Sequence, residues 1–207
     1  MKVTLKILLL GAVVLLSYMC YRSIMGPIEF QDEKTLREDR IIKRLMDIRA
    51  AQIEYKNRKG VHAANFDELT TFLNTEKLPY LLKEGVLTDE QLESGMTEAD
   101  AVKKGLIKRD TFWVLAKDTL FGGKNVDSLR FVPGTVATFQ MDTASITNAS
   151  GYTLQLFEAS VEYPVYLGDL NKQEVANLID LRVKQDKFPG LKVGSVKEAN
   201  NYAGNWE

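Results

Sequence analysis

The sequence predicts an α+β fold carried on an N-terminal transmembrane helix. Three observations favour it: an uncharged apolar run over residues 7–21, a long amphipathic helical pattern downstream of it, and extended, alternating segments after Asp110. Helical periodicity first and strand periodicity later, without regular alternation of the two, is typical of an antiparallel sheet with short helices packed beside it.

The apolar run is long enough to cross a bilayer. Counted over residues 3–25, it has 23 residues, which is about 34 Å of helix at roughly 1.5 Å per residue against a hydrocarbon core of about 30 Å. Lys2 and Lys6 precede the run, whereas only Arg22 closely follows it. The positive-inside bias therefore predicts a cytoplasmic N-terminus and a body in the periplasm of a bacterium. We expect residues 1–27 to be an inner (cytoplasmic) membrane anchor.

A cleaved signal peptide is the alternative interpretation, because a charged start and an apolar run of about 15 residues also fit one. Residues 17–22, which follow the run, lack the pair of small residues that signal peptidase needs. Cys20 suggests a lipoprotein, but it is preceded by Met19, where lipoprotein sites have Gly, Ala or Ser. An uncleaved anchor is favoured, with Cys20 as a small apolar residue of the span.

The composition of residues 28–207 excludes several classes of function. This part holds 24 Lys and Arg against 28 Asp and Glu, because three of the chain's 27 basic residues lie before it. Such a mixed, mildly acidic balance argues against nucleic acid or anionic lipid as a partner. Cys20 is the only cysteine, so this part has no thiol for a disulfide, a structural zinc site or thiol chemistry.

A second helix is predicted beyond the anchor. Gly26 and Pro27 are expected to end the membrane helix or break it sharply. An amphipathic pattern then runs over about residues 34–58 and ends at Gly60, which predicts an amphipathic helical stalk over residues 28–60.

The apolar stripe of this stalk has two interpretations. It can pack on the protein's own sheet, or it can pair with a partner helix as a short coiled coil. The pairing seam would span only about two heptads, fewer than the three or four that a coiled coil needs, so packing within the chain is favoured. The candidate partner interface is formed by Ile41, Leu45, Ile48, Gln52 and Tyr55.

An α+β domain is predicted over residues 61–207. Asn65 and Glu68 have the spacing of a capping box, which predicts a helix to about residue 74. A strand is predicted over residues 78–83, and Pro79 indicates that it lies at a sheet edge.

Residues 86–110 form a surface insertion in this prediction. They are too polar and too rich in glycine to be core, and they contain two short helical turns, over residues 88–95 and 97–105. The insertion is either a solvated connector or a docking surface, since loops often carry function.

Extended segments follow. Residues 112–115 are predicted to be a buried strand, and residues 148–151 to be the turn of an antiparallel hairpin. A helix opened by Asn171 and Glu174 should reach about residue 184. Further strands are predicted over residues 129–132, 137–141, 152–161, 165–167 and 191–193.

One stretch carries a family pattern. It reads Leu45-x-x-Ile48-x-x-Ala51-x-x-x-Tyr55-Lys56-x-x-x-Gly60, followed by Phe66-x-x-Leu69. This stretch resembles the segment after the membrane helix in type IV pilins and in the pseudopilins of type II secretion. In those proteins a long helix ends in a tyrosine, a basic or polar pair and a glycine, and it leads to an antiparallel sheet. The resemblance, over roughly residues 36–73, implies a pilin-like architecture.

The N-terminal segment departs from the pilin pattern. Processed pilins carry a short basic leader that ends in Gly and is cut before Phe, with a Glu near the start of the mature helix. Here Gly11 is followed by Ala12 and Val13, and the span has no carboxylate. The resemblance therefore implies a pilin-like architecture on an unprocessed anchor. The whole chain is also similar to an uncharacterised family of single-span bacterial envelope proteins, which implies no particular activity.

No catalytic, cofactor-binding or metal site is expected. His62, the only histidine, is predicted to be a surface residue of a turn. Residues 121–124, with sequence FGGK, lack the spacing of a phosphate-binding loop. Acidic residues such as Asp89 and Glu90 lie in polar helical turns rather than in a cleft. The sequence therefore predicts no enzyme, no cofactor and no small-molecule substrate.

The aromatic residues are weaker pointers to partners. Phe112 and Trp113 should lie on opposite faces of a strand, and one of them is expected to fill the core. Trp206 is expected to pack back and hold the C-terminal tail. The alternative is that these aromatics, with Tyr202, form platforms that bind sugar or protein.

The sequence supports two hypotheses of function. The first is a non-enzymatic component of a bacterial envelope assembly, of the kind found in pili and secretion systems, which binds a protein partner or a second copy of itself. The second is a membrane-tethered module that binds cell-wall glycan or another ligand.

Overall fold

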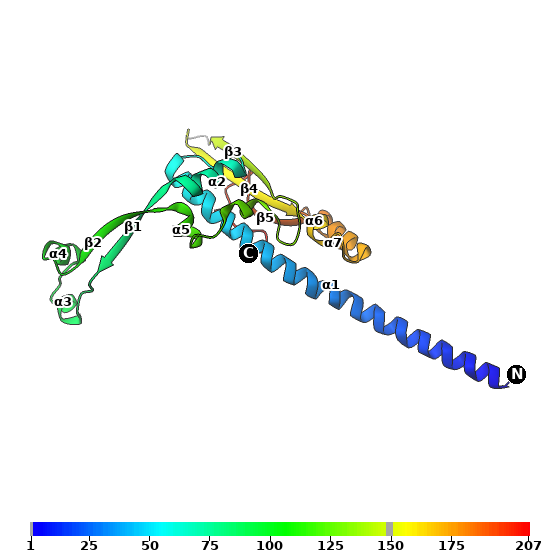
Figure 1. Cartoon of the computed structure of the whole chain (residues 1–207). Coiled ribbons are helices and arrows are strands. Elements are labelled where there is room, and N and C mark those ends of the chain that lie inside the picture. The colour runs from blue at the N-terminus through cyan, green and yellow to red at the C-terminus, as the bar shows by residue number, and fades with distance from the viewer. Residues whose placement is uncertain (1, 148–150) are drawn as a thin grey trace. The chain divides into compact units, whose positions relative to one another are not determined.

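The protein folds as an α+β chain with a long N-terminal apolar helix and antiparallel sheets, as the sequence predicts (Figure 1). The structure is a computed structural model, and it describes residues 2–147 and 151–207. The chain divides into two compact units: Met1–Arg49 with Leu129–Glu207, which we call unit 1, and Ala50–Ser128, which we call unit 2.

Helix α1 (Lys2–Lys59) runs unbroken through Gly26 and Pro27. The predicted break is therefore wrong. Proline removes a single helical hydrogen bond, the one to the carbonyl of Ser23, while the residues on both sides retain theirs. The predicted end is confirmed: Gly60 adopts a left-handed φ of 79° and its amide donates to the Lys56 carbonyl at 2.8 Å.

The N-terminal part of α1 is long and apolar enough to cross a membrane, and its most apolar stretch is not buried within the chain. Leu8 and Leu10, for example, are about 70% exposed. Further along the same helix, Ile41, Leu45 and Ile48 have no exposed surface and belong to the core of unit 1.

The sheet of unit 1 has the order β3-β4-β5 and is antiparallel throughout. Its strands are β3 (Gln140–Thr147), β4 (Thr153–Glu162) and β5 (Gly190–Gly194). The central strand β4 contributes Leu156, Phe157, Ala159 and Val161 to the core. The predicted β3–β4 hairpin is confirmed by this pairing, although residues 148–150 of its predicted turn lie outside the described residues.

Two other strand predictions in unit 1 are wrong. Residues 165–167 lie in the short helix α6 (Tyr163–Leu167), because Pro164 occupies its first turn with a φ preset for helix. Residues 129–132 begin in the 3-10 helix η1 (Val126–Arg130), and Phe131 makes only an isolated bridge to Thr138. Helix α7 (Lys172–Lys184) is as predicted, with the Asn171 side chain accepting from the Gln173 amide at 3.0 Å.

Unit 2 contains a two-stranded antiparallel ribbon and four short helices. Its elements are α2 (Phe66–Thr75), β1 (Lys77–Glu84), α3 (Asp89–Glu93), α4 (Glu98–Lys103), β2 (Lys108–Leu115) and α5 (Ala116–Phe121). Helices α3 and α4 lie in the connection between the two strands (Figure 1). The N-cap is confirmed, since Asn65 accepts from the Glu68 amide at 2.9 Å. Glu68 in turn accepts at 3.0 Å from the amide of Ala64, the residue before the cap.

Candidate partner-binding surface

The β1–β2 ribbon exposes several large apolar side chains of unit 2. The strands pair without interruption from Lys77↔Leu115 to Glu84↔Lys108, and they form a sheet of two strands. Because side chains alternate between faces along a strand, this register sets Tyr80 beside Phe112 on one face. It sets Pro79 beside Trp113 on the other.

The ribbon's large side chains are exposed on both faces. Trp113 is 60% exposed, Tyr80 52% and Phe112 51%, and Leu82 is 37% exposed. The strand over residues 112–115 is therefore confirmed, but its predicted burial is wrong, and neither Phe112 nor Trp113 fills the core. Within the described part of unit 2 no third strand pairs with the ribbon, and Leu78, at the ribbon end near α2 and α5, is buried.

The two edges of the ribbon differ. The Ala116 amide donates to the Glu76 carbonyl at 2.9 Å, so hydrogen-bonded pairs fall at the even positions of β1. Pro79, which has no amide hydrogen, then faces outward, as a proline within a sheet must. On β2 the backbone groups of Thr111 and Trp113 face outward by the same alternation. The β2 edge therefore keeps both donors and acceptors for another strand.

The residues predicted as a partner interface lie mostly in the interior. Four of these five residues have no exposed surface. This placement corresponds to packing within the chain, which is the interpretation that the sequence favours. The set is Ile41, Leu45, Ile48 and Gln52, each with 0% exposure, and Tyr55, which is partly buried.

Gln52 and Tyr55 fix the chain that follows α1. The Gln52 side chain donates to the Ala63 carbonyl and accepts from the Ala63 amide, both at 3.0 Å. The Tyr55 ring meets Phe72 edge-on, with centroids 5.0 Å apart. His62, predicted at the surface, is only 6% exposed. That prediction is wrong because the turn is drawn inward at Ala63, the next residue.

In unit 1, Arg37 joins α1 to the segment between α6 and α7. Its guanidinium donates to both carboxylate oxygens of Asp169, at 2.5 and 2.8 Å, and to the Tyr166 carbonyl at 2.7 Å. It also pairs with Glu33 at 2.7 Å. The hydrogen bonds to Asp169 and then to Glu33 raise the pKa of Arg37, and Arg37 in turn lowers the pKa of the Asp169 carboxyl.

Tyr166 adds a buried contact to this junction. Its ring is 2% exposed, and its hydroxyl donates to Glu38 at 3.2 Å. Burial and then the charge of Glu38 raise the pKa of the Tyr166 hydroxyl. The phenol therefore stays protonated and keeps α6 against α1.

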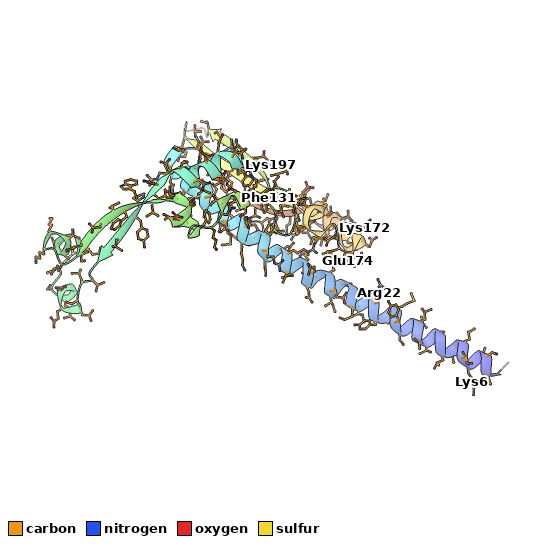
Figure 2. The ribbon with its side chains drawn as sticks, viewed as in Figure 1. Lys6, Arg22, Phe131, Lys172, Glu174 and Lys197 are labelled. Carbon is orange, nitrogen blue, oxygen red and sulfur yellow. The ribbon has the colours of Figure 1, made fainter. Side chains whose placement is uncertain are left out.

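A cleft of about 1000 Å³ lies beside this junction, between α1 and the start of α7. Figure 2 marks Arg22 on α1 and Glu174 at the start of α7. The cleft is apolar along much of α1 and charged at four of its residues. The lining residues with aromatic or charged side chains include Tyr18, Tyr21, Arg22, Glu29, Glu33 and Glu174.

The C-terminal tail packs as the sequence predicts. Gly204 bridges to Val193 of β5, and a Cβ at Gly204 would overlap the Trp206 ring. Tyr202 stacks on Phe157 with ring centroids 5.2 Å apart. Glu207 pairs with Arg49 of α1 at 2.7 Å. These contacts hold the tail on unit 1.

Across residues 2–147 and 151–207, no three His, Cys, Asp or Glu side chains gather to hold a metal ion. Comparison with protein-family models, with curated proteins and with solved structures finds no match to this chain.

The exposed β1–β2 ribbon is the surface that the sequence analysis does not predict. The sequence shows only that two strands with large apolar side chains flank a polar connection. That no third strand of unit 2 pairs with them is known from the structure.

Proposed function

We propose that this protein is a non-enzymatic component of a bacterial envelope assembly, anchored in the inner membrane with its body in the periplasm. In this proposal the β1–β2 ribbon binds a protein partner. The observation that carries it is the exposure of Tyr80, Phe112 and Trp113 on a ribbon that nothing in unit 2 covers.

An uncovered ribbon of this kind is unfavourable in free energy. A two-stranded ribbon is at best marginally stable in water unless another element covers it. Large aromatic side chains are also enriched at protein–protein interfaces and often carry most of the binding energy. A partner that covers the ribbon would remove this apolar surface from water and could add a strand to the β2 edge.

The anchor follows from the apolar stretch of α1 and its flanking charges. Lys6 stands before the stretch, whereas Glu29, Asp32 and Glu33 follow soon after Arg22. This bias supports a cytoplasmic N-terminus. The pilin-like architecture belongs to the same proposal. One helix that continues without a break into a unit with an antiparallel sheet supports it.

Photo-crosslinking in living cells tests the proposal. A photoreactive amino acid replaces Phe112 or Trp113 in the full-length protein, and Val136, which is 96% exposed in unit 1, serves as the matched exposed control. We expect one discrete crosslinked protein, identified as an envelope component, at positions 112 and 113 and not at 136. An equal, diffuse pattern at all three positions would contradict the proposal.

A glycan-binding module remains the second candidate, because exposed aromatics such as Trp113 can stack on sugar rings. The ribbon favours protein over glycan, since Phe112 and Trp113 lie on opposite faces and form no shared platform. Retention of the purified protein on peptidoglycan, lost in Trp113→Ala, would favour the glycan candidate instead.

A further inference from the structure

We propose that the cleft between α1 and α7 binds the headgroup of a phospholipid that ends in a primary ammonium group. The inference rests on the proposed membrane anchor, because it needs α1 to leave the bilayer near Arg22. It adds a ligand site that is separate from the ribbon.

The cleft lies at the level where α1 would leave the membrane. It begins beside Tyr18 and Tyr21 at the end of the uncharged run and extends along α1 to Glu33. Tyrosine is enriched at this depth because its ring is apolar and its hydroxyl is polar. The start of α7, at Leu170 and Asn171, forms the opposite wall. A lipid beside α1 could therefore enter the cleft without leaving the bilayer.

The charges in the cleft follow the order of charges in such a headgroup. Arg22 lies at the membrane end, where its guanidinium also donates to the Tyr18 hydroxyl at 3.2 Å. Glu29 is seven residues further along the helix, about 10 Å toward the periplasm, and Glu174 lies across from α1 on α7. In a phospholipid the phosphate is nearer the acyl chains and the ammonium lies beyond it. Arg22 can hold the phosphate while the two carboxylates accept from the ammonium.

The same charges select against other common headgroups. Glu33 is already paired with Arg37, so Glu29 and Glu174 are the carboxylates available to a ligand. A headgroup with no cation leaves both carboxylates uncompensated beside its own negative phosphate. A quaternary ammonium carries the charge but has no N–H to donate, so it forms no charge-assisted hydrogen bond. A primary ammonium satisfies both requirements.

The test measures lipid binding to the purified full-length protein by native mass spectrometry. Phosphatidylethanolamine, phosphatidylcholine and phosphatidylglycerol are titrated separately into the detergent-solubilised protein. We expect phosphatidylethanolamine to bind about tenfold more tightly than the other two, the difference that charge-assisted hydrogen bonds supply. Glu29→Gln with Glu174→Gln should remove this preference, and Arg22→Gln should weaken all three lipids. The matched control, Glu198→Gln, changes an exposed carboxylate outside the cleft and should change nothing.

Three results would overturn the inference: equal binding of the three lipids, a preference for phosphatidylglycerol, or a double variant that keeps the preference. Circular dichroism and the thermal midpoint of each variant, compared with the parent protein, check that the fold is retained. Alkaline washing of membranes tests the anchor separately. Release of the protein by the wash contradicts the anchor itself, whereas an anchored protein without lipid preference contradicts only the lipid site.

Discussion

At the scale of single residues, Gln52 explains how a polar side chain can belong to an apolar stripe. It is fully buried, a position that is unfavourable for an amide unless its polar atoms are bonded. Its two hydrogen bonds to the Ala63 backbone meet that need. They also fold the chain back directly after the end of α1. Gln52 is thus a structural residue rather than part of an exposed seam.

Replacing Gln52 by Ala should destabilise the protein by about 2–4 kcal/mol, because the buried amide and carbonyl of Ala63 lose their partners. The free energy of unfolding, measured with a chemical denaturant, checks this. Asn57→Ala, which removes an exposed contact with Glu54 on the same helix, is the control and should change stability by less than about 0.5 kcal/mol. Equal effects of the two substitutions would contradict the structural role of Gln52.

The Arg37–Asp169 pair predicts a pH dependence. Arg37 lowers the pKa of Asp169 in the folded state. In mild acid the Asp169 carboxylate is therefore protonated in the unfolded chain but still ionised in the folded protein. The pair therefore stabilises the fold at neutral pH, and its contribution is lost as the pH falls below about 3.9, the ordinary Asp value, toward the lowered one. Because the Asp169 side chain is 65% exposed, we expect less than about 1 kcal/mol.

Asp169→Asn measures this contribution. The free energy of unfolding of the variant should be lower than that of the parent protein at pH 7, and the difference should shrink as the pH is lowered toward 3. A difference that stays constant over this range would mean that the Asp169 carboxylate charge does not stabilise the junction.

At the scale of elements, the sequence predicts local structure well where local signals are strong. Asn65 and Glu68 predict the start of α2, Asn171 predicts the start of α7, and Gly60 predicts the end of α1. All three predictions are confirmed. These features depend on residues only a few positions apart. Pro164 is a helix signal as well, although the residues behind it, 165–167, are predicted from sequence to be a strand.

The predictions that are wrong concern features that local sequence signals do not determine. Nothing near Phe112 and Trp113 reveals whether another layer covers their strand, so a buried strand and a bare ribbon look alike in sequence. The unbroken course of α1 through Pro27 has a similar origin, since the helical preference of long flanking segments outweighs one lost hydrogen bond. The lining of the cleft by α7 likewise required the tertiary structure.

The exposure of the ribbon predicts that its aromatics contribute to binding rather than to stability. Changing Phe112 and Trp113 together to Ser should leave the free energy of unfolding within about 0.5 kcal/mol, as is usual at exposed positions, and should abolish the partner crosslink. Leu78→Ala, on the same ribbon but 4% exposed, is the opposite control and should cost about 2–5 kcal/mol. A large loss of stability in the Ser variant would mean that these aromatics are covered within the protein.

The difference between the ribbon's edges gives a sharper test at this scale. Thr111→Pro removes an amide that faces outward, so the ribbon should form normally while the β2 edge loses a donor. Phe112→Pro removes an amide that bonds to β1 and should disrupt the ribbon. Hydrogen exchange of the amides of residues 77–84 distinguishes the two variants. Equal protection in both would show that the alternation inferred from the Ala116–Glu76 hydrogen bond is incorrect.

At the scale of the whole molecule, α1 is the element that connects the proposed membrane anchor to both units. Its continuity decides whether motion at one end of α1 is passed along its length. A helix that continued through Pro27 would hold the sheet of unit 1 at a fixed height above the bilayer. A helix that broke there would leave the body loosely tethered, and the α1 wall of the lipid-binding cleft would not be continuous.

The distance between two spin labels on α1 tests this continuity. In a Cys20→Ser background, labels at Leu16→Cys and Leu36→Cys flank Pro27 at exposed positions and lie 20 residues apart, which corresponds to about 30 Å in one helix. Labels at Leu36→Cys and Asn57→Cys, with no proline between them, are the control at about 31 Å. We expect two narrow distance distributions of similar width in the full-length protein. A shorter and broader distribution confined to the first pair would show that α1 bends at Pro27, and the cleft would then lose its continuous α1 wall.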